Sequence, residues 1–441
     1  MNAAGAIFTL VAVLLQFVLP RRLAIVPLLL TFAWMTRGQV LELGSADFTV
    51  MRIVICAGFL RVLLRGERPA HGVNAVDGWL LVWAAWLMAV VPFHADGAAV
   101  FRLGLMGDYL GGYFLARIFL RSAQDVSLSF KVLCVCFVPV AISMVVEKLS
   151  GLNPFFALGG VHELAEIRNG KIRASGPYAH PILGGTVGAA LMAMAMSLWR
   201  DHRASALVGL AAGATMVVAS NSSGPILMGL FVVLGLLMWN FRQHMNALRW
   251  SALAGVLALA AVMRDPVYFV IAKIDLAGGS TGWHRAQLIH SSIAHLDEWW
   301  ITGTDRTRHW MSSGIVGNTQ DADITNHYLQ MGVWGGLSLM VIFCIALVMA
   351  FRMIGRAVRQ TMDAPSGHRP QCWFIGAALF GYVMSFLSIS LFDQSNFAFM
   401  LLLAAASVTR AEAVPASGDV LLDENAPGRF VTPSFAHWAH R

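Results

Sequence analysis

Two arginines in this sequence have the side-chain type and the setting that bind a phosphate group. The first, Arg173, lies shortly before Pro177 in a long polar segment. Proline suits the first turn of a helix, so Pro177 predicts a helix start whose free backbone N–H groups lie beside Arg173. A guanidinium group also binds phosphate through parallel hydrogen bonds. We therefore expect an anion site at Arg173; a contact with lipid headgroups is the alternative.

The second arginine, Arg285, follows a helix start that is expected at Ser280 or Thr281. The helix is predicted to be amphipathic and to lie on a membrane surface. Its apolar positions are Leu288, Ile293, Leu296 and Trp300. A cation in the first turn is unfavourable with the helix dipole unless an anion is bound. Arg285 is thus a second phosphate candidate, with a solvated helix residue as the alternative.

His327 is the candidate general base. It lies where a long apolar run begins, and both burial and a helix N-terminus favour an uncharged imidazole. An uncharged imidazole can accept a proton from a hydroxyl group. The alternative is an interfacial histidine that only makes hydrogen bonds. Asp321 and Asp323 lie nearby, but paired acids are common in polar loops, so we predict no metal site.

The composition predicts an all-α protein that crosses a membrane many times. Hydrophobic residues make up 57% of the 441 residues and charged residues 12%, whereas a soluble domain carries about 25% charged residues. The net charge of +7 comes mainly from arginines in loops beside the spans, so we do not take it as a sign of nucleic-acid binding. The five cysteines lie in or beside apolar runs and are expected to be neither disulfides nor metal ligands.

The apolar runs predict about twelve or thirteen transmembrane helices. They are residues 3–19, 23–36, 48–64, 76–92, 101–119, 127–146, 178–199, 205–220, 225–240, 250–263, 325–350, 372–392 and 397–408. Arginines occupy every second loop, which places those loops in the cytoplasm. The long segments 147–177 and 264–324 then form the outer, periplasmic side, and Trp299, Trp300 and Trp310 are expected at the interface. Residues 1–408 form the membrane domain, and residues 409–441 are predicted to be a disordered cytoplasmic tail.

Three elements in order resemble motifs of the O-antigen ligase and O-antigen polymerase superfamily of bacterial envelope glycan enzymes. The first is an arginine followed by a glycine and a His-Pro pair, here Arg173, Gly176, His180 and Pro181. The second is an arginine before an amphipathic helix, here Trp283-His284-Arg285 with Gly303 further on. The third is Asn326-His327-Tyr328-Leu329-Gln330, followed by Gly332 and the pair Gly335-Gly336. One departure is Ser223, where the family often has an arginine.

The resemblance implies a glycosyltransferase C fold and metal-independent transfer from an undecaprenyl-diphosphate-linked glycan, with no cofactor. It implies that Arg173 and Arg285 hold the diphosphate and that His327 activates the acceptor hydroxyl. Residues that would contact the acceptor or support the site are Gly176, Tyr178, His180, His284, Asn326 and Tyr328. Further expected partners are the lipid bilayer, a glycan or lipid acceptor, and envelope polysaccharide assembly proteins.

The preferred function is a polymerase of an exopolysaccharide or O-antigen in the inner membrane, with its site facing the periplasm. Ser223 leaves one positive charge fewer than in the family pattern, which favours a polymerase over a ligase acting on lipid A core or protein. A transporter or flippase is a second alternative, and a non-catalytic scaffold is a third. Few ionisable residues lie inside apolar runs, and no repeat is seen, which disfavours a transporter. Those residues are Arg52, Asp108, Lys131 and Asp393.

Overall fold

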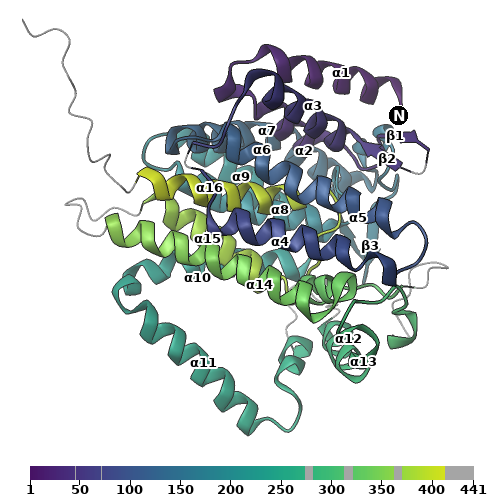
Figure 1. Cartoon of the computed structure of the whole chain (residues 1–441), viewed down its shortest axis with the longest axis vertical. Coiled ribbons are helices and arrows are strands. Elements are labelled where there is room, and N and C mark those ends of the chain that lie inside the picture. Colours follow the sequence, from purple (N-terminus) through teal and green to yellow (C-terminus); the bar gives the residue numbers. More distant parts are fainter. Residues whose placement is uncertain (45, 71, 274–281, 312–320, 362–369, 413–441) are drawn as a thin grey trace, which may run out of the picture.

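The computed structural model describes residues 1–44, 46–70, 72–273, 282–311, 321–361 and 370–412. The α-helices are α1 (Ala3–Val18), α2 (Val26–Trp34), α3 (Val50–Arg65), α4 (Ala75–Ala89), α5 (Ala98–Met106), α6 (Gly112–Phe119), α7 (Ala123–Ser150), α8 (Pro181–Ser197), α9 (Arg203–Ser220), α10 (Ser223–Leu237), α11 (Met245–Val262), α12 (Gly282–Ala294), α13 (Leu296–Trp299), α14 (His327–Thr361), α15 (Gln371–Ser385) and α16 (Asn396–Glu412). Two antiparallel hairpins complete the regular structure, β1 (Val40–Leu43) with β2 (Ala46–Thr49) and β3 (Glu166–Arg168) with β4 (Lys171–Arg173). Most of the long helices lie side by side in one bundle (Figure 1).

Five helical stretches are long and apolar enough to cross a membrane, judged by length and composition among the described residues. They are Ala75–Phe93, Ala123–Ser150, Arg203–Ser220, Ser223–Val262 and His327–Gln360. Shorter apolar helices are Ala3–Val18, Pro181–Ser197, Gln371–Ser385 and Asn396–Val408. The chain is therefore helical and has the helices of a membrane protein, as its composition predicts; how many of them cross a bilayer stays a prediction.

Helix α11 shows why a hydrocarbon environment suits this chain. Figure 1 shows α11 apart from the other helices, and none of its residues is buried. Its apolar side chains are open to the surroundings, with Trp250 71% and Val262 83% exposed. Inside the bundle, small residues instead allow close contact: a Cβ at Gly188 of α8 would lie 2.7 Å from the carbonyl oxygen of Gly213 of α9.

The predicted spans 101–119 and 325–350 are both interrupted. A π-helical turn at Gly107–Gly111 separates α5 from α6. In α14 the helix breaks at Gly335 and Gly336, where Gly336 has φ +74°. The outer segment fills this break, because Leu337 donates its N–H to the carbonyl of Trp300 at 2.9 Å. A Cβ at Gly336 would lie 2.2 Å from the carbonyl oxygen of Ile301, so only glycine fits there.

The outer segment 264–324 differs from the prediction in two respects. Its amphipathic helix is not continuous to Trp300: α12 ends at Ala294, and α13 is a separate short helix. Trp299 and Trp310 are not at an interface, since both are 4% exposed and form a small core with Leu288 and neighbouring apolar residues. Trp300, by contrast, is half exposed. The predicted cap residues Ser280 and Thr281 lie outside the described residues.

The chain end also differs from its prediction. Helix α16 continues to Glu412, so residues 409–412 are helical and not disordered; residues 413–441 lie outside the described part. The core of α16 is apolar on all sides, with Phe399, Leu401 and Ala404 fully buried. A helix that is hydrophobic all round lies in the interior of a bundle, and α16 packs there against α6, α14 and α15.

Candidate functional site

Arg173 lies at the end of the β3–β4 hairpin and is only 2% exposed. One of its Nη atoms donates to the carboxylate of Glu166, and the other donates to the Oγ of Ser222 at 2.6 Å. Its Nε is buried without a hydrogen-bond partner among the described residues. Burial lowers the pKa of Arg173, with Glu166 opposing and Arg168 adding to that shift. A buried guanidinium with an unused donor is suited to hold an anion.

Arg285 lies in α12, is 7% exposed, and also has a buried Nε without a partner among the described residues. Its pKa is lowered to about 10, mainly by burial and also by the positive charges of Arg168 and Arg173, while Asp323 opposes this shift. Arg173 and Arg285 are therefore near enough for their charges to interact, and their role as two phosphate ligands stays a prediction. Sequence reasoning missed Arg168, which joins them. We call Arg168, Arg173 and Arg285 the arginine cluster.

His180 belongs to the surroundings of the arginine cluster. Its Nε2 lies 3.5 Å from a carboxylate oxygen of Glu166, and its Nδ1 accepts the N–H of Ile182 at 3.1 Å. Burial lowers the pKa of His180 to about 4; Glu166 opposes this, and the cluster arginines add to it. Helix α8 begins at Pro181 with His180 as its cap, so the predicted helix start at Pro177 is wrong by about one turn.

The segment before α8 is held by buried carboxylates. The N–H groups of Ser175 and Gly176 donate to Glu147, and the N–H of Ala179 donates to Asp393 at 3.0 Å. Gly176 has φ +60°, a conformation that favours glycine. Tyr178 is fully buried in the core, and its hydroxyl has no hydrogen-bond partner among the described residues.

His327 is enclosed. It is 0% exposed, and its ring lies against Tyr109, Phe343 and Phe386. Its Nδ1 lies 3.3 Å from the N–H of Leu391 and 3.4 Å from the Oγ of Ser390. Because the Leu391 N–H must donate, Nδ1 is the acceptor and the ring proton of the neutral imidazole is on Nε2. His327, which the sequence predicts as the general base, is therefore not directly accessible from the surface.

The neighbours of His327 in the motif are structural. Asn326 caps α14 by accepting the N–H of Leu329 at 3.0 Å, and it donates to the carbonyl of Leu387. Tyr328 donates to the carbonyl of Val383 at 2.8 Å. These hydrogen bonds agree with the supporting role that was one of their two predicted roles; contact with an acceptor stays a prediction. His284 lies near Asp323. Burial raises the pKa of Asp323, and the neighbouring His284 and Arg285 oppose this shift.

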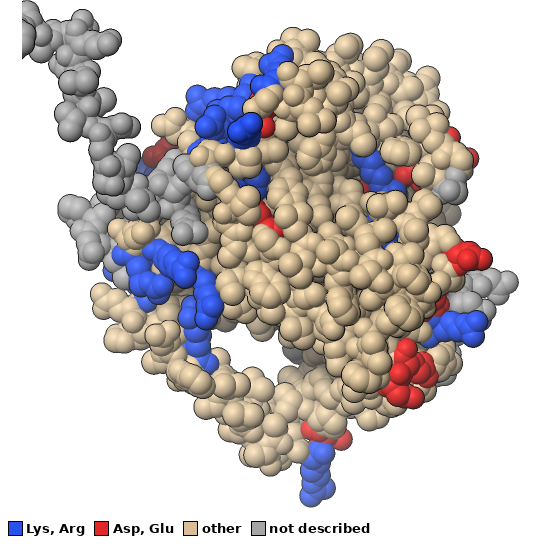
Figure 2. Space-filling model, viewed as in Figure 1, with Lys and Arg blue, Asp and Glu red and all other residues tan. Residues whose placement is uncertain are grey.

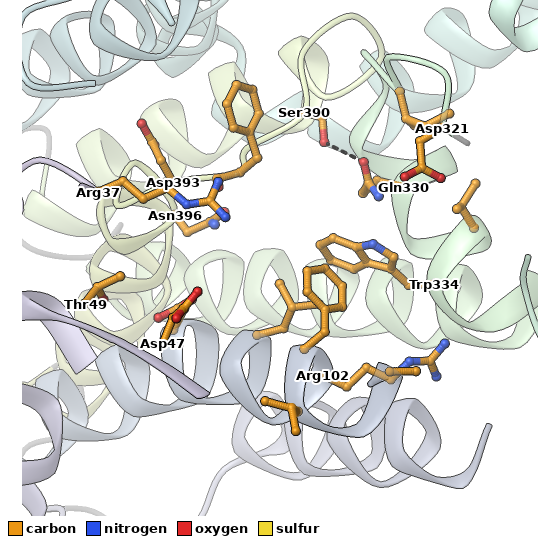
Figure 3. A pocket seen from close by; sticks show the side chains of 18 of the residues that line it. Arg37, Asp47, Thr49, Arg102, Asp321, Gln330, Trp334, Ser390, Asp393 and Asn396 are labelled. Carbon is orange, nitrogen blue, oxygen red and sulfur yellow. Dashed lines mark hydrogen bonds between the residues drawn. The ribbon is translucent and has the colours of Figure 1, made fainter. Parts of the chain in front are cut away.

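A cavity of about 1250 Å³ is lined by Asp323, Gln330 and Ser390, but not by Arg173, Arg285 or His327. In Figure 3, Arg37, Asp47, Arg102, Gln330, Trp334, Ser390, Asp393 and Asn396 surround it. The Arg52–Asp108 ion pair, 2.6 Å long, also lines the cavity, and Asp108 comes from the π-helical turn. Asp323 lines the cavity as well, and its charge raises the pKa of Arg285.

Sequence reasoning missed this cavity, although a signal was present. Arg52, Asp108 and Asp393 are ionisable residues inside or beside apolar runs, and such residues mark functional positions in membrane proteins. The described residues give no metal-binding group with Asp321, Asp323 and His327; the one group of histidine and carboxylate ligands among them lies elsewhere, at His295, Glu298 and His309.

The chain was also compared with known proteins. No protein-family model matches it, and no curated protein matches it either.

Charge is segregated on the molecular surface. On the face drawn in Figure 2, Lys and Arg gather toward one end of the bundle, on the left. Most Asp and Glu gather toward the opposite end, where Figure 1 places the β3–β4 hairpin, α12 and α13. A broad surface without charged residues separates the two ends. Lys and Arg side chains also lie among the Asp and Glu at that end (Figure 2), so the arginine cluster belongs to an end of mixed charge.

Proposed function

We propose that this chain is a membrane glycosyltransferase that moves a glycan from an undecaprenyl diphosphate carrier to an acceptor hydroxyl. The observation that carries the proposal is the arginine cluster. In it Arg173 and Arg285 are buried, their charges interact, and each has an Nε without a hydrogen-bond partner among the described residues. Lipid-headgroup anchors are surface side chains, whereas these two are enclosed. Glu166 and Asp323 offset part of the positive charge, and a diphosphate would supply the remaining negative charge.

The arginine cluster would assist the departure of the diphosphate. The acceptor oxygen forms a bond to the anomeric carbon as the bond from that carbon to the diphosphate oxygen breaks. The electron pair leaves with the diphosphate, and fixed guanidinium groups stabilise the charge that develops there. The acceptor proton goes to a base. This chemistry needs no metal ion at the diphosphate, in keeping with the metal-independent family that the motifs resemble.

His327 would receive that proton through Ser390. Ser390 lines the cavity, and its Oγ lies 3.4 Å from Nδ1 of His327. The acceptor proton passes to Ser390 while the Ser390 proton passes to Nδ1, so the hydroxyl is restored. The rings of Tyr109, Phe343 and Phe386 surround the imidazole, and the Phe386 ring, 4.5 Å away between centroids, is close enough to stabilise the cation.

The cavity would hold saccharide. Its volume of about 1250 Å³ exceeds the roughly 300–1,000 Å³ of usual small-molecule pockets. Trp334 and Phe101 provide aromatic surface, and the carboxylates and amides accept hydrogen bonds from sugar hydroxyls. With the cationic end in the cytoplasm, the opposite end and the cavity would face the periplasm of a bacterial inner membrane. The product would be an exopolysaccharide or O-antigen polymer.

Deletion of the gene followed by gel analysis of surface glycans tests the proposal. Products with a single repeat unit indicate a polymerase, whereas long unattached chains indicate a ligase for lipid A core or protein. The Arg52–Asp108 pair at the cavity also suits a transporter of lipid-linked glycan. Purified protein supplied with donor and acceptor in proteoliposomes separates these functions, because only a transferase forms a new glycosidic bond; donor movement without a new bond would overturn the proposal.

A further inference from the structure

A second group of ligand-type side chains lies in the outer segment, apart from the arginine cluster. His295 precedes α13, Glu298 lies within α13, and His309 lies in the 3-10 turn Arg308–Trp310. Nδ1 of His295 lies 2.9 Å from Oε1 of Glu298, and Nε2 of His309 lies 2.9 Å from Oε2. One ligand atom from each of the three residues lies within 4.8 Å of the others.

The types of these atoms match a transition-metal site. Two imidazole nitrogens and one carboxylate form a ligand set that binds Zn²⁺ in proteins, with water as fourth ligand. Ligand distances of about 2.0–2.2 Å place tetrahedral ligand atoms roughly 3.3–3.6 Å apart. The contacts of 2.9 Å would have to widen by about 0.4–0.7 Å, and ligand atoms that lie up to 4.8 Å apart would have to move closer together. Imidazole ligands favour Zn²⁺ and its neighbours over Mg²⁺ or Ca²⁺.

Neighbouring side chains hold these ligands in place. The buried Trp310 donates its Nε1–H to Oε2 of Glu298 at 3.0 Å, and its ring stacks on His295 with an interplanar angle of 7°. Such contacts orient ligands in metal sites. Burial would raise the pKa of Glu298, but hydrogen bonds from Trp310, His309 and His295 hold it lower, so Glu298 is a carboxylate at neutral pH. A metal ligand must be deprotonated in this way.

We propose that His295, Glu298 and His309 bind a Zn²⁺-type ion, which ties α13 to the turn Arg308–Trp310. Between these two elements, the chain from Trp300 to Thr304 docks on the broken helix α14, through hydrogen bonds to Leu337 and Val333. The ion would therefore stabilise the docked outer segment, which also carries Arg285 on α12. It would take no part in glycan transfer, so the proposal stands independently of the proposed function.

The test is metal binding by the full chain, purified in detergent through a tag without histidine. We expect one Zn²⁺ per chain by calorimetry, and a visible d–d spectrum with Co²⁺ of a site containing nitrogen and oxygen ligands. His309→Ala should weaken Zn²⁺ affinity at least about a hundredfold, and Trp310→Phe about tenfold through the lost hydrogen bond to Glu298. His309→Cys should restore binding, because a thiolate is also a zinc ligand.

His290→Ala is the matched control, since His290 is a nearby histidine of α12 whose Nδ1 lies 2.9 Å from the hydroxyl of Tyr268. It should leave Zn²⁺ affinity unchanged. Zn²⁺ should also raise the midpoint of thermal unfolding of the wild-type protein and not that of His309→Ala, provided that both elute as folded single species. Equal Zn²⁺ affinity in wild type and His309→Ala, or no stoichiometric binding, would overturn the proposal. The three residues would then be only a hydrogen-bonded group.

Discussion

Arg173 donates a hydrogen bond of 2.6 Å to the Oγ of Ser222, which joins the β3–β4 hairpin to the turn between α9 and α10. This is the turn at which the resembled family often carries an arginine and this chain carries Ser223. In this chain the turn contributes the hydroxyl of Ser222, which holds Arg173 of the β3–β4 hairpin in place. The orientation of the arginine cluster therefore depends on a residue that does not itself carry charge.

Ser222→Ala should weaken donor use by about tenfold, seen as a higher KM for the lipid-linked donor, because a hydrogen bond to a charged group contributes about 1.5–3 kcal/mol. Initial rates of glycan transfer at several donor concentrations measure this. Ser143→Ala is the control, since the buried Ser143 hydroxyl has no partner among the described residues. An unchanged KM in Ser222→Ala would show that Ser222 does not position Arg173.

Ser390→Ala should lower kcat by about a hundredfold or more and leave the KM for donor nearly unchanged, since general base catalysis contributes roughly 10²–10⁴-fold. His327→Ala should cause a loss at least as large. Ser388→Ala is the control, because its hydroxyl donates to the nearby carbonyl of Ser385. Full kcat in Ser390→Ala would exclude the transfer of a proton through this hydroxyl to His327.

His180 should make the folded protein less stable in mild acid. Its pKa falls from an ordinary 6.5 to about 4 in the folded chain, so the unfolded chain binds more protons between these values. The stability that the neutral His180 contributes is fully present above the unfolded pKa, and it is lost as the pH falls from 6.5 toward 4. His180→Asn keeps a helix cap without this titration. The midpoint of thermal unfolding should therefore depend less on pH in His180→Asn than in the wild type. An identical pH dependence in both would show that the titration of His180 does not affect stability.

Gly336→Ala should destabilise the protein by about 1–3 kcal/mol or more, because the left-handed backbone is strained for alanine and the added Cβ meets the carbonyl of Ile301 at 2.2 Å. Thermal unfolding in detergent and limited proteolysis of the outer segment measure the loss. Gly355→Ala in the same helix is the control, since no atom lies within 4 Å of its added Cβ. Equal stability of the two variants would mean that the outer segment does not need the break in α14.

The sequence predicts the helices better than it predicts the site. Apolar runs identify where the helices lie, because a lipid-facing or buried helix must be apolar along its length. The break in α14 is harder to foresee, since the pair Gly335-Gly336 alone does not reveal that Trp300 docks into it. That Arg173 and Arg285 lie near each other is implied only by the family resemblance. The enclosure of His327 depends on Phe343 and Phe386, whose positions only the packed bundle fixes.

The central claim is that the arginine cluster binds a diphosphate. Calorimetric titration of undecaprenyl diphosphate into the protein in nanodiscs tests this most directly. Arg173→Ala and Arg285→Ala should each weaken the Kd by about tenfold or more, and lysine at either position should restore it only in part. Arg306→Ala should bind like the wild type, because Arg306 is exposed in the same outer segment. If Arg173→Ala and Arg285→Ala bound the diphosphate as tightly as Arg306→Ala, the arginine cluster would not be the donor site.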